Sequence, residues 1–526
     1  MQHSLRLALG CLVLSGLGMT PAVAASSADG STTSIVKTTH GPVQGELLED
    51  GLRVFRGIPY AAPPVGELRW RAPQPAAAWT ETLDATSFGD ACPQLPLLSM
   101  MTGEPLPPTS EDCLFLNVWT PRADSGAERP VMVWIHGGGL NLGWSHQAVY
   151  EGSELARRGV VLVSINYRLG PLGFLAHPDL SKEAVISGNY GFLDQIAALQ
   201  WVQENAAAFG GDPDNVTIFG ESAGGTSVHV LTATPNAKGL FHRAIAQSPW
   251  VTETNLAHLT EATAFMPSSE QLGLDWAAKA TGKDGASLDE LRALDPKTII
   301  QKSGAGQYQV VVTHGQGTLL ANSSEERFAE AQHNEVPMIV GTNQNEGTLF
   351  MAQMPVGTRQ AFEGFVGMQY KKQSAKVAAM YPSTTTEELR RSVDQFLTDS
   401  WFLRASRNML IGATKTKAPA FQYHFTRINP QQPALGAHHA AELGYVFNTN
   451  EGDVFGKTDA AIADAMIRYW VQFAKTGDPN VDGLPSWPAF DAESQSYLEI
   501  GDELRTGTGL RREHNDALES VRSALK

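Results

Sequence analysis

The chain has 526 residues, of which 42% are hydrophobic and 18% are charged, as in an ordinary globular protein. Its formal net charge of −16 argues against nucleic acid or an anionic membrane as its main partner. No linker-like or repetitive tract divides the sequence, so we expect a single domain over residues 25–526.

The first 24 residues have the pattern of a secretory signal rather than of a folded element. A charged start ending at Arg6 precedes an apolar run over residues 7–19, and residues 22–24 (Ala-Val-Ala) offer a small-x-small cleavage site. That run is too short to span a bilayer, and no later segment is long and apolar enough. We therefore expect cleavage near Ala24 and a secreted or periplasmic protein without a membrane span.

Cys11 lies inside the expected signal, which leaves Cys92 and Cys113 in the mature protein. Two cysteines in an exported protein suggest one disulfide, with two free buried thiols as the alternative. A bridge that closes a loop of about 20 residues should stabilise the fold by roughly 3 kcal/mol.

The first predicted buried strand, residues 131–135, is followed at once by a His-Gly-Gly-Gly turn at 136–139. Near-continuous apolarity in a short β-branched run indicates a parallel strand that is covered on both faces. The turn after it can direct backbone N–H groups at an oxyanion. Binding phosphate is another use of such a turn, but no Lys-Ser or Lys-Thr pair follows.

Residues 160–165 and 216–219 predict two further buried strands with a helix between them. We expect the segment 210–213 to end that helix. Strand, helix and strand in this order favour an α/β fold with a doubly wound sheet. The helix is indicated by the i, i+3, i+4 spacing of Phe192, Ile196, Leu199, Val202 and Ala206.

The sharpest chemical signal is Gly-Glu-Ser-Ala-Gly at residues 220–224, directly after the strand that ends at Phe219. A serine between a strand and a helix stands exposed on a strained turn, and small flanking residues let the neighbouring backbone approach. Ser222 is therefore the expected nucleophile, and the N–H of Ala223 is a further candidate oxyanion donor.

Residues 254–333 show several helical stretches and weak strand signals. We expect a helical insertion over the sheet edge, of the kind that builds pocket walls and lids. A fourth predicted strand, residues 338–340, follows this segment.

A serine nucleophile needs a base and an orienting acid, and both candidates lie late in the chain. Glu346 follows the strand at 338–340 on a turn, and His438 and His439 share a Gly/Ala-rich loop. Spacing alone does not choose between the two histidines. His439 and Glu442 could also bind a metal, but no H-E-x-x-H motif or Cys cluster accompanies them, so we expect neither metal nor cofactor.

Several motifs in order resemble the type-B carboxylesterase family, which includes the cholinesterases. The likeness runs from about residue 41 to residue 490, and it includes FRGIPYA at 55–61, SEDCLFLN at 110–117, GNYGFLDQ at 188–195 and FAKTGDPN at 473–480. The resemblance implies an α/β-hydrolase fold: a large, mostly parallel central sheet flanked by helices, with helical insertions that form the pocket wall. It implies a serine carboxylesterase that acts on small-molecule esters.

The resemblance also assigns roles to individual residues. Ser222 matches the nucleophile and Glu346 the acid, and His439 matches the base because it stands three residues before Glu442. The remaining matches are the oxyanion-hole donors Gly138, Gly139 and Ala223, the first disulfide loop closed by Cys92 and Cys113, and Glu221, an acidic residue beside the nucleophile.

The substrate side of the site favours neutral esters over choline esters. Cholinesterases hold the ammonium group over a Trp in the first disulfide loop, whereas residues 93–112 contain no aromatic residue. A second family position for choline contact is Leu349 here, followed by Phe350. Trp250 is either a wall of the acyl side of the pocket or a core residue.

Two rival interpretations remain at this point. The fold that the resemblance implies also hosts non-catalytic binding proteins, which typically lack the nucleophile that Ser222 would supply here. The closer rival is an esterase specialised for a polymeric or toxin ester. We expect a monomer or a weak homo-oligomer in either case.

Overall fold

The structure is a computed structural model that describes residues 33–122, 128–184, 186–304, 308–351, 354 and 356–525. The expected signal segment, with its cleavage site near Ala24, lies outside the described residues. Within those ranges, no helix is both long enough and apolar enough to cross a membrane.

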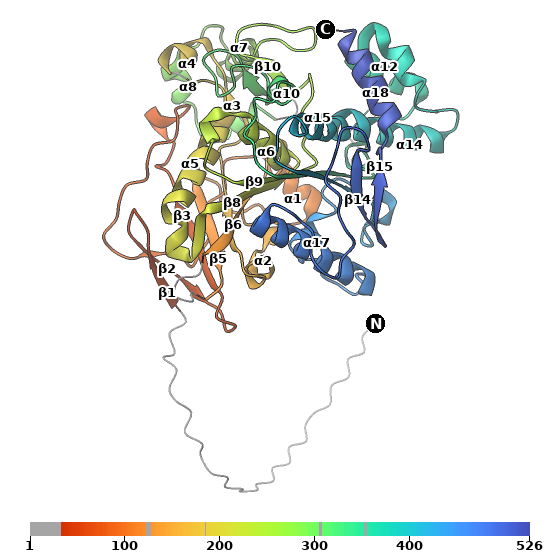
Figure 1. Cartoon of the computed structure of the whole chain (residues 1–526). Coiled ribbons are helices and arrows are strands. Elements are labelled where there is room, and N and C mark those ends of the chain that lie inside the picture. Colours follow the sequence, from red (N-terminus) through yellow and green to blue (C-terminus); the bar gives the residue numbers. More distant parts are fainter. Residues whose placement is uncertain are drawn as a thin grey trace, which may run out of the picture.

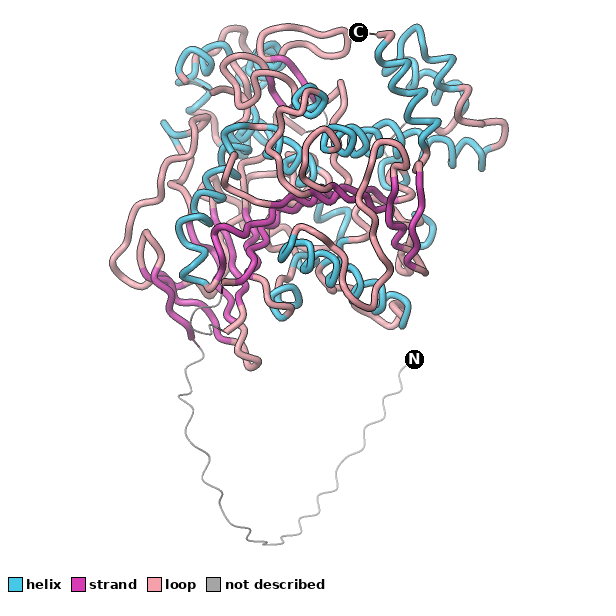
Figure 2. The backbone as a smooth tube through the Cα atoms, viewed as in Figure 1, coloured by secondary structure: helices cyan, strands magenta, loops and turns pink. Residues whose placement is uncertain are grey.

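One twisted sheet runs through the middle of the molecule (Figure 2). Thirteen strands of the described chain belong to it, including β4 (Leu83–Asp84), which pairs with β2 beside the main path. The central strands run parallel, and both ends of the sheet are antiparallel. The order along the sheet is β1 (Thr33–Lys37), β2 (Pro42–Leu47), β3 (Arg53–Pro59), β5 (Phe115–Thr120), β7 (Val161–Ile165), β6 (Arg129–Ile135), β8 (Gly211–Glu221), β9 (Arg243–Gln247), β12 (Met338–Asn343), β13 (Ala420–Phe425), β14 (Ser496–Ile500) and β15 (Leu504–Thr508).

Helices cover both faces of this sheet (Figure 1). They are α1 (Leu97–Thr102), α2 (Ser153–Arg157), α3 (Gly170–Phe174), α4 (Pro178–Glu183), α5 (Tyr190–Asn205), α6 (Ala223–Ala233), α7 (Ser269–Thr281), α8 (Leu288–Arg292), α9 (Pro296–Gln301), α10 (Ser324–Ala329), α11 (Thr348–Met351), α12 (Arg359–Tyr370), α13 (Ser374–Ala378), α14 (Thr386–Leu397), α15 (Arg404–Ala413), α16 (Leu443–Val446), α17 (Lys457–Thr476) and α18 (Arg512–Ser523), with a π-helix (Thr398–Leu403) joining α14 to α15.

Strand β6 shows why the central strands are apolar on both sides. Val131, Val133 and Ile135 pack in one core with residues of α5, α6 and α15, whereas Met132 and Trp134 pack in a second core with residues of α2, α16 and α17. Alternate side chains of a strand point to opposite faces, so a sheet with two covered faces needs apolar residues at every position. This is the predicted α/β architecture, and the fold is that of an α/β-hydrolase.

The four predicted strands lie in β6, β7, β8 and β12, which are all central and parallel. The expected helix end at 210–213 is wrong in detail. α5 ends at Asn205, a short 3-10 turn follows, and Gly210 closes it with a left-handed φ of 83°. Gly211 already pairs with Arg129 of β6, so residues 211–213 begin the strand.

The segment 254–333 contains α7, α8, α9 and α10, as the sequence predicts, and it lies at the top of Figure 1 near α3. It is not purely helical. β10 (Leu256–His258) and β11 (Val312–His314) form a small parallel sheet of their own.

A disulfide joins Cys92 to Cys113 across a sequence separation of 21 residues. The loop that it closes carries α1, whose Met100 is 78% exposed. In the chain-entropy model, a closure of this length stabilises the fold by about 3 kcal/mol.

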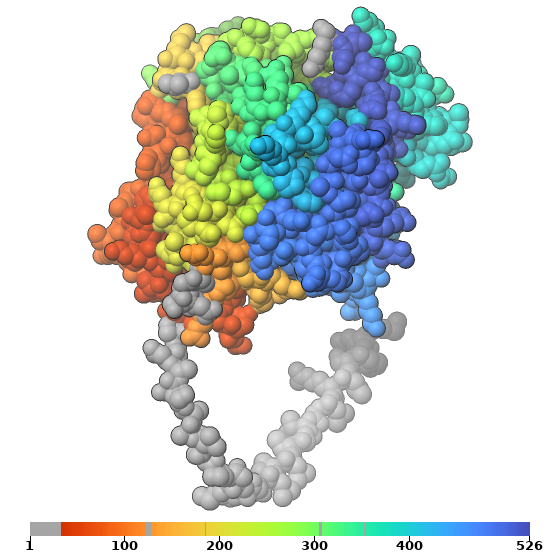
Figure 3. All heavy atoms as spheres, viewed as in Figure 1, coloured from red at the N-terminus to blue at the C-terminus, as the bar shows by residue number. Residues whose placement is uncertain are grey.

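The C-terminal helix α18 is tied to the π-helix region by buried charges. Arg404, whose side chain is 1% exposed, lies 3.0 Å from Glu325 and 3.3 Å from Glu519 of α18. Arg522 of α18 pairs with Glu253 and lies 3.3 Å from Glu325. In Figure 3 the blue C-terminal segment also packs against the cyan segment that contains α12 and α14.

Candidate active site

Ser222 occupies a sharp turn between β8 and α6. Its φ of 57° and ψ of −118° lie in a strained region for a residue with a side chain. The flanking glycines make the turn sterically possible. A Cβ atom on Gly224 would overlap the carbonyl oxygen of Ile135, and one on Gly220 would come within 2.6 Å of the same oxygen. The backbone of β6 therefore packs directly against this turn.

The glycine-rich loop at 136–139 lies against Ser222. A Cβ atom on Gly137 would be 3.2 Å from Cβ of Ser222 and 3.1 Å from Oε2 of Glu221. Gly138 and Gly139 have φ values of 105° and 64°, which favour glycine. In the part of the chain that the structure describes, the N–H groups of Gly138, Gly139 and Ala223 donate no hydrogen bond, so they are available to an oxyanion.

Glu346 and His439 meet at the carboxyl ends of β12 and β13. Nδ1 of His439 lies 2.6 Å from Oε2 of Glu346. The other oxygen of Glu346 accepts hydrogen bonds from the hydroxyl of Ser248 at 2.6 Å and from the N–H of Asn343 at 2.7 Å. Both Glu346 and His439 are buried, and this contact anchors the Nδ1 side of the imidazole.

The other ring nitrogen of His439 faces Glu221 rather than the nucleophile. Nε2 lies 3.1 Å from Oε1 of Glu221, and among the described residues it makes no hydrogen bond. Hydrogen bonds between a nucleophile and its base are often long or misaligned in unliganded enzymes and tighten when substrate binds. The imidazole is thus bracketed by two carboxylates, one at each nitrogen.

Burial and neighbouring charge set the pKa values in this cluster. Burial lowers the pKa of His439, but the carboxylates of Glu221, Glu346 and Glu442 outweigh it, so the net pKa lies above its ordinary value. Burial raises the pKa of Glu221, and the proximity of His439 opposes that rise. Burial also raises the pKa of Glu442, which accepts hydrogen bonds from Asn343 at 2.6 Å and Gln247 at 3.0 Å.

The side chain of His438 takes no part in this cluster. Its Nδ1 lies 2.7 Å from the carbonyl oxygen of His439, and its Nε2 lies 3.3 Å from the amide of Asn429. Burial lowers its pKa. Of the two histidines that the sequence left open, only His439 contacts Glu346 in the structure.

Aromatic rings line the side of His439 that faces the π-helix. The rings of Phe350 and Phe402 lie 5.1 Å and 4.7 Å from the imidazole. Trp250 packs on Trp401 at 5.3 Å, and Trp401 contacts Phe350 at 5.7 Å. Leu349 is half-buried on α11 beside Phe350.

Sequence reasoning missed Trp401 and Phe402, because no motif marks a π-helix.

Sequence reasoning also missed Ser248 as a partner of the acid. It has a positive φ of 48° at the end of β9, and its N–H donates to the carbonyl oxygen of Gly341 in β12. Its hydroxyl reaches Glu346 across 98 residues of sequence. Nothing local in Gln-Ser-Pro at 247–249 signals this contact, because it depends on two parallel strands lying side by side.

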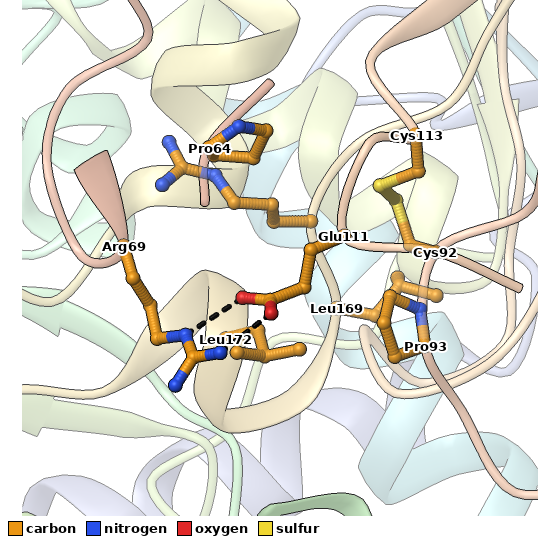
Figure 4. A pocket seen from close by; sticks show the side chains of 9 residues that line it. Pro64, Arg69, Cys92, Pro93, Glu111, Cys113, Leu169 and Leu172 are labelled. Atoms are coloured by element: carbon orange, nitrogen blue, oxygen red, sulfur yellow. Dashed lines mark hydrogen bonds and ion pairs between the residues drawn. A yellow bond between two sulfur atoms is a disulfide. The ribbon is translucent and has the colours of Figure 1, made fainter. Parts of the chain in front are cut away.

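A small cavity lies beside the disulfide, and it does not include the cluster around His439. Figure 4 shows Arg69 and Glu111 pointing toward each other there, with contacts of 2.7 Å and 2.5 Å. Within the described residues, no group of three or more His, Cys, Asp and Glu side chains is arranged to hold a metal ion.

The matching family model, the similar proteins and the similar solved structures are all described as esterases. A family model described as the carboxylesterase family matches residues 32–518. The chain is 38% identical over 486 residues to para-nitrobenzyl esterase of Bacillus subtilis (strain 168), which covers 90% of this chain and 96% of that protein. It is 35% identical over 486 residues to fumonisin B1 esterase of Sphingopyxis macrogoltabida, with coverage of 90% and 87%.

Two further matches agree with these. Cocaine esterase of Homo sapiens is 34% identical over 525 residues, covering 91% of this chain and 90% of that protein. A solved structure of a PNB esterase superposes with a TM-score of 0.81 at 33% identity, covering 92% of this chain and 99% of that one.

Replacing Gly224 by Ala should destabilise the protein, because the added methyl group overlaps the carbonyl oxygen of Ile135. We expect a loss of about 2 kcal/mol in the free energy of unfolding, measured in urea, as for other overpacked sites. Gly364→Ala in α12 is the matched control, since a Cβ atom there meets nothing within 4 Å. Equal stability of the two variants would contradict the close packing of β6 on the Ser222 turn.

Proposed function

The chain belongs to the carboxylesterase family and is a carboxylic ester hydrolase, and from this premise we propose that it hydrolyses neutral carboxylic esters through an acyl-enzyme on Ser222. In this proposal His439 is the base and Glu346 the acid that orients it. The observation that carries the proposal is the 2.6 Å contact between Nδ1 of His439 and Glu346, formed beside the strained Ser222 turn.

Acylation begins when Nε2 of His439 removes the proton from Oγ of Ser222 as that oxygen attacks the ester carbonyl. For this step Nε2 turns from Glu221, where it lies in the unliganded protein, toward Ser222. Glu346 keeps the proton on Nδ1 and stabilises the imidazolium that forms. His439 then protonates the leaving alcohol.

The oxyanion of each tetrahedral intermediate binds the N–H groups of Gly138, Gly139 and Ala223. Among the described residues these N–H groups have no other acceptor, and Gly137 lies close to Ser222, which supports this role. A water molecule activated by His439 then releases the carboxylic acid from Ser222 by the same route in reverse.

The substrate pocket in this proposal lies beside Glu221, Trp250, Leu349 and Phe350. The contact of Phe350 with the His439 ring supports its part, and the packing of Trp250 on Trp401 supports an aromatic wall. Residues 93–112 contribute no aromatic ring, so the pocket lacks the cation-binding Trp of the choline esterases.

We further propose that the mature protein is one catalytic domain, residues 25–526, exported after cleavage near Ala24 and acting as a monomer or weak homo-oligomer. The disulfide between Cys92 and Cys113 supports export, because disulfides persist in oxidising compartments.

Ser222→Ala should lower kcat by about 10⁴-fold or more, since the members of a triad act as a unit. The measurement is hydrolysis of 4-nitrophenyl acetate, with an initial burst of one nitrophenol per wild-type chain. An organophosphate should label Ser222 alone, as peptide mass spectrometry would show. A Ser222→Ala variant with a tenth of the wild-type activity, or a wild-type protein without hydrolysis, would refute the proposal.

Two histidine variants serve as a matched pair for the same assay. His439→Ala should be nearly as inactive as Ser222→Ala. His438→Ala should keep most of its activity, because His438 contacts backbone and Asn429 rather than Glu346. The reverse result would assign the base to His438.

Glu221→Gln should shift the acid limb of the kcat/KM profile to lower pH. The base must be neutral to accept a proton, and the Glu221 carboxylate raises the pKa of His439 by stabilising the imidazolium. Its removal should therefore lower the kinetic pKa. Glu387→Gln, which removes a charge from an exposed position on α14, is the control and should leave the profile in place. If the acid limb of the kcat/KM profile stays in place in Glu221→Gln, Glu221 is not part of the proposed site.

The protein should have a higher kcat/KM for a neutral alkyl ester than for the choline ester of the same acid. A desolvated cation–π contact is worth about 2 kcal/mol, and this chain lacks the Trp that would supply it in the first disulfide loop. A clear preference for the choline ester would show that another part of the chain binds the cation.

The same assay tests the rival esterase. One relative is a fumonisin B1 esterase, so a panel should include that toxin ester and a polyester beside small esters. A kcat/KM for either that exceeds all small esters would favour the specialised enzyme.

A further inference from the structure

Glu346 and His439 stand on two loops that leave the sheet side by side. β12 and β13 are paired as far as Asn343 and Phe425, where both strands end. Beyond that point a lone bridge joins Asn345 to His438, and the N–H of Asn345 donates to the carbonyl oxygen of Ala437 at 2.9 Å. Two further hydrogen bonds join the same loops, from Nδ2 of Asn343 to the carbonyl oxygen of His438 at 2.8 Å and from the hydroxyl of Thr348 to the carbonyl oxygen of Leu435 at 2.7 Å. The bridge at Asn345 is thus one of the contacts that set the relative position of acid and base.

The side chain of Asn345 reinforces the bridge and extends it to a third element. Its Oδ1 accepts a hydrogen bond from the N–H of Ala437 at 3.1 Å. That contact turns its Nδ2 toward α14, where it donates to Oδ2 of Asp394 at 2.8 Å. One amide thus links the turn of the acid, the loop of the base and a helix behind them.

Asp394 is a buried carboxyl group, 5% exposed, that the acyl-transfer steps do not use. It is also in contact with the acid turn through its backbone, because a Cβ atom on Gly347 would come within 2.6 Å of the Asp394 carbonyl oxygen. Burial raises the pKa of Asp394 to about 6. Burying a carboxyl group costs free energy unless hydrogen bonds offset that cost, and the bond from Asn345 is one that does so.

We propose that Asp394 is a positioning residue, which fixes the turn of Glu346 against the loop of His439 through the side chain of Asn345. This inference rests on the proposed function of Glu346 and His439. Without the Asp394 acceptor, Nδ2 of Asn345 loses its partner at 2.8 Å, and the amide is no longer held in the orientation that Ala437 requires. The backbone hydrogen bond between the two loops then remains, but the side-chain link from Asn345 to α14 is lost.

Losing the link between Asn345 and Asp394 should slow the chemical steps and leave substrate binding unchanged. Asp394→Ala should lower kcat for 4-nitrophenyl acetate about tenfold, since small displacements of catalytic groups cost one to two orders of magnitude. KM should stay within about twofold, because acylation and deacylation use the same triad and slow together. Rates are counted per site titrated with an organophosphate, so that misfolded protein does not enter them.

Asp394→Asn is the decisive companion variant. Its amide oxygen can accept the same hydrogen bond from Asn345, so it should restore kcat to within about threefold of the wild type. Asn345→Ala should reproduce the loss, and the double variant with Asp394→Ala should lose no more than either single variant. Asp459→Ala, which removes a buried aspartate paired with Arg427, controls for destabilisation and should lower the melting temperature without changing kcat per site.

The inference is overturned if Asp394→Ala keeps its wild-type kcat per titrated site, or if Asp394→Asn is as slow as Asp394→Ala. If Asp394→Ala does not fold, the test is Asn345→Ala, because Asn345 is only half-buried. An unchanged kcat in Asn345→Ala would then overturn the inference. These results are separate from a failure of the proposed function, in which the organophosphate would not label Ser222 of the wild type at all.

Discussion

The carboxylate of Glu346 is completely buried, and a buried charge is stable only where hydrogen-bond donors replace its lost hydration. Here the donors are the hydroxyl of Ser248, the N–H of Asn343 and the imidazole of His439. They stand at or beyond the ends of β9, β12 and β13, which are neighbours in the parallel sheet. Moving any of these strand ends would take away one of the three donors, so this one group constrains the geometry of the whole site.

A second constraint acts through backbone contact alone. The carbonyl oxygen of Ile135 at the end of β6 fills the space where side chains of residues 220 and 224 would lie. The turn of Ser222 is therefore pressed against the strand that leads into the glycine-rich loop. Because rigid backbone rather than flexible side chains sets this distance, the nucleophile and the free N–H groups keep their relative positions.

The sequence predicts local features, but it does not predict contacts between residues that lie far apart in the chain. The strands at 131–135 and 216–219 and the turn of Ser222 could be predicted, because apolar periodicity and a short motif encode them. The choice of His439 over His438 needed the family resemblance. The contacts of Glu346 with Ser248 and of Asn345 with Asp394 could not be predicted, because they join residues 98 and 49 positions apart through the packing of separate elements.

The ion pairs of α18 link its docking to the folding of the site. Arg404 and Arg522 share the carboxylates of Glu253, Glu325 and Glu519, and two of these five groups belong to the last helix. Before α18 docks, Glu253 and Glu325 depend on a single guanidinium, that of Arg404. Arg404 directly follows the π-helix that places Phe402 against His439, so docking of α18 completes the charge compensation at that end of the π-helix. Docking of α18 and folding of the aromatic wall are in this sense thermodynamically coupled.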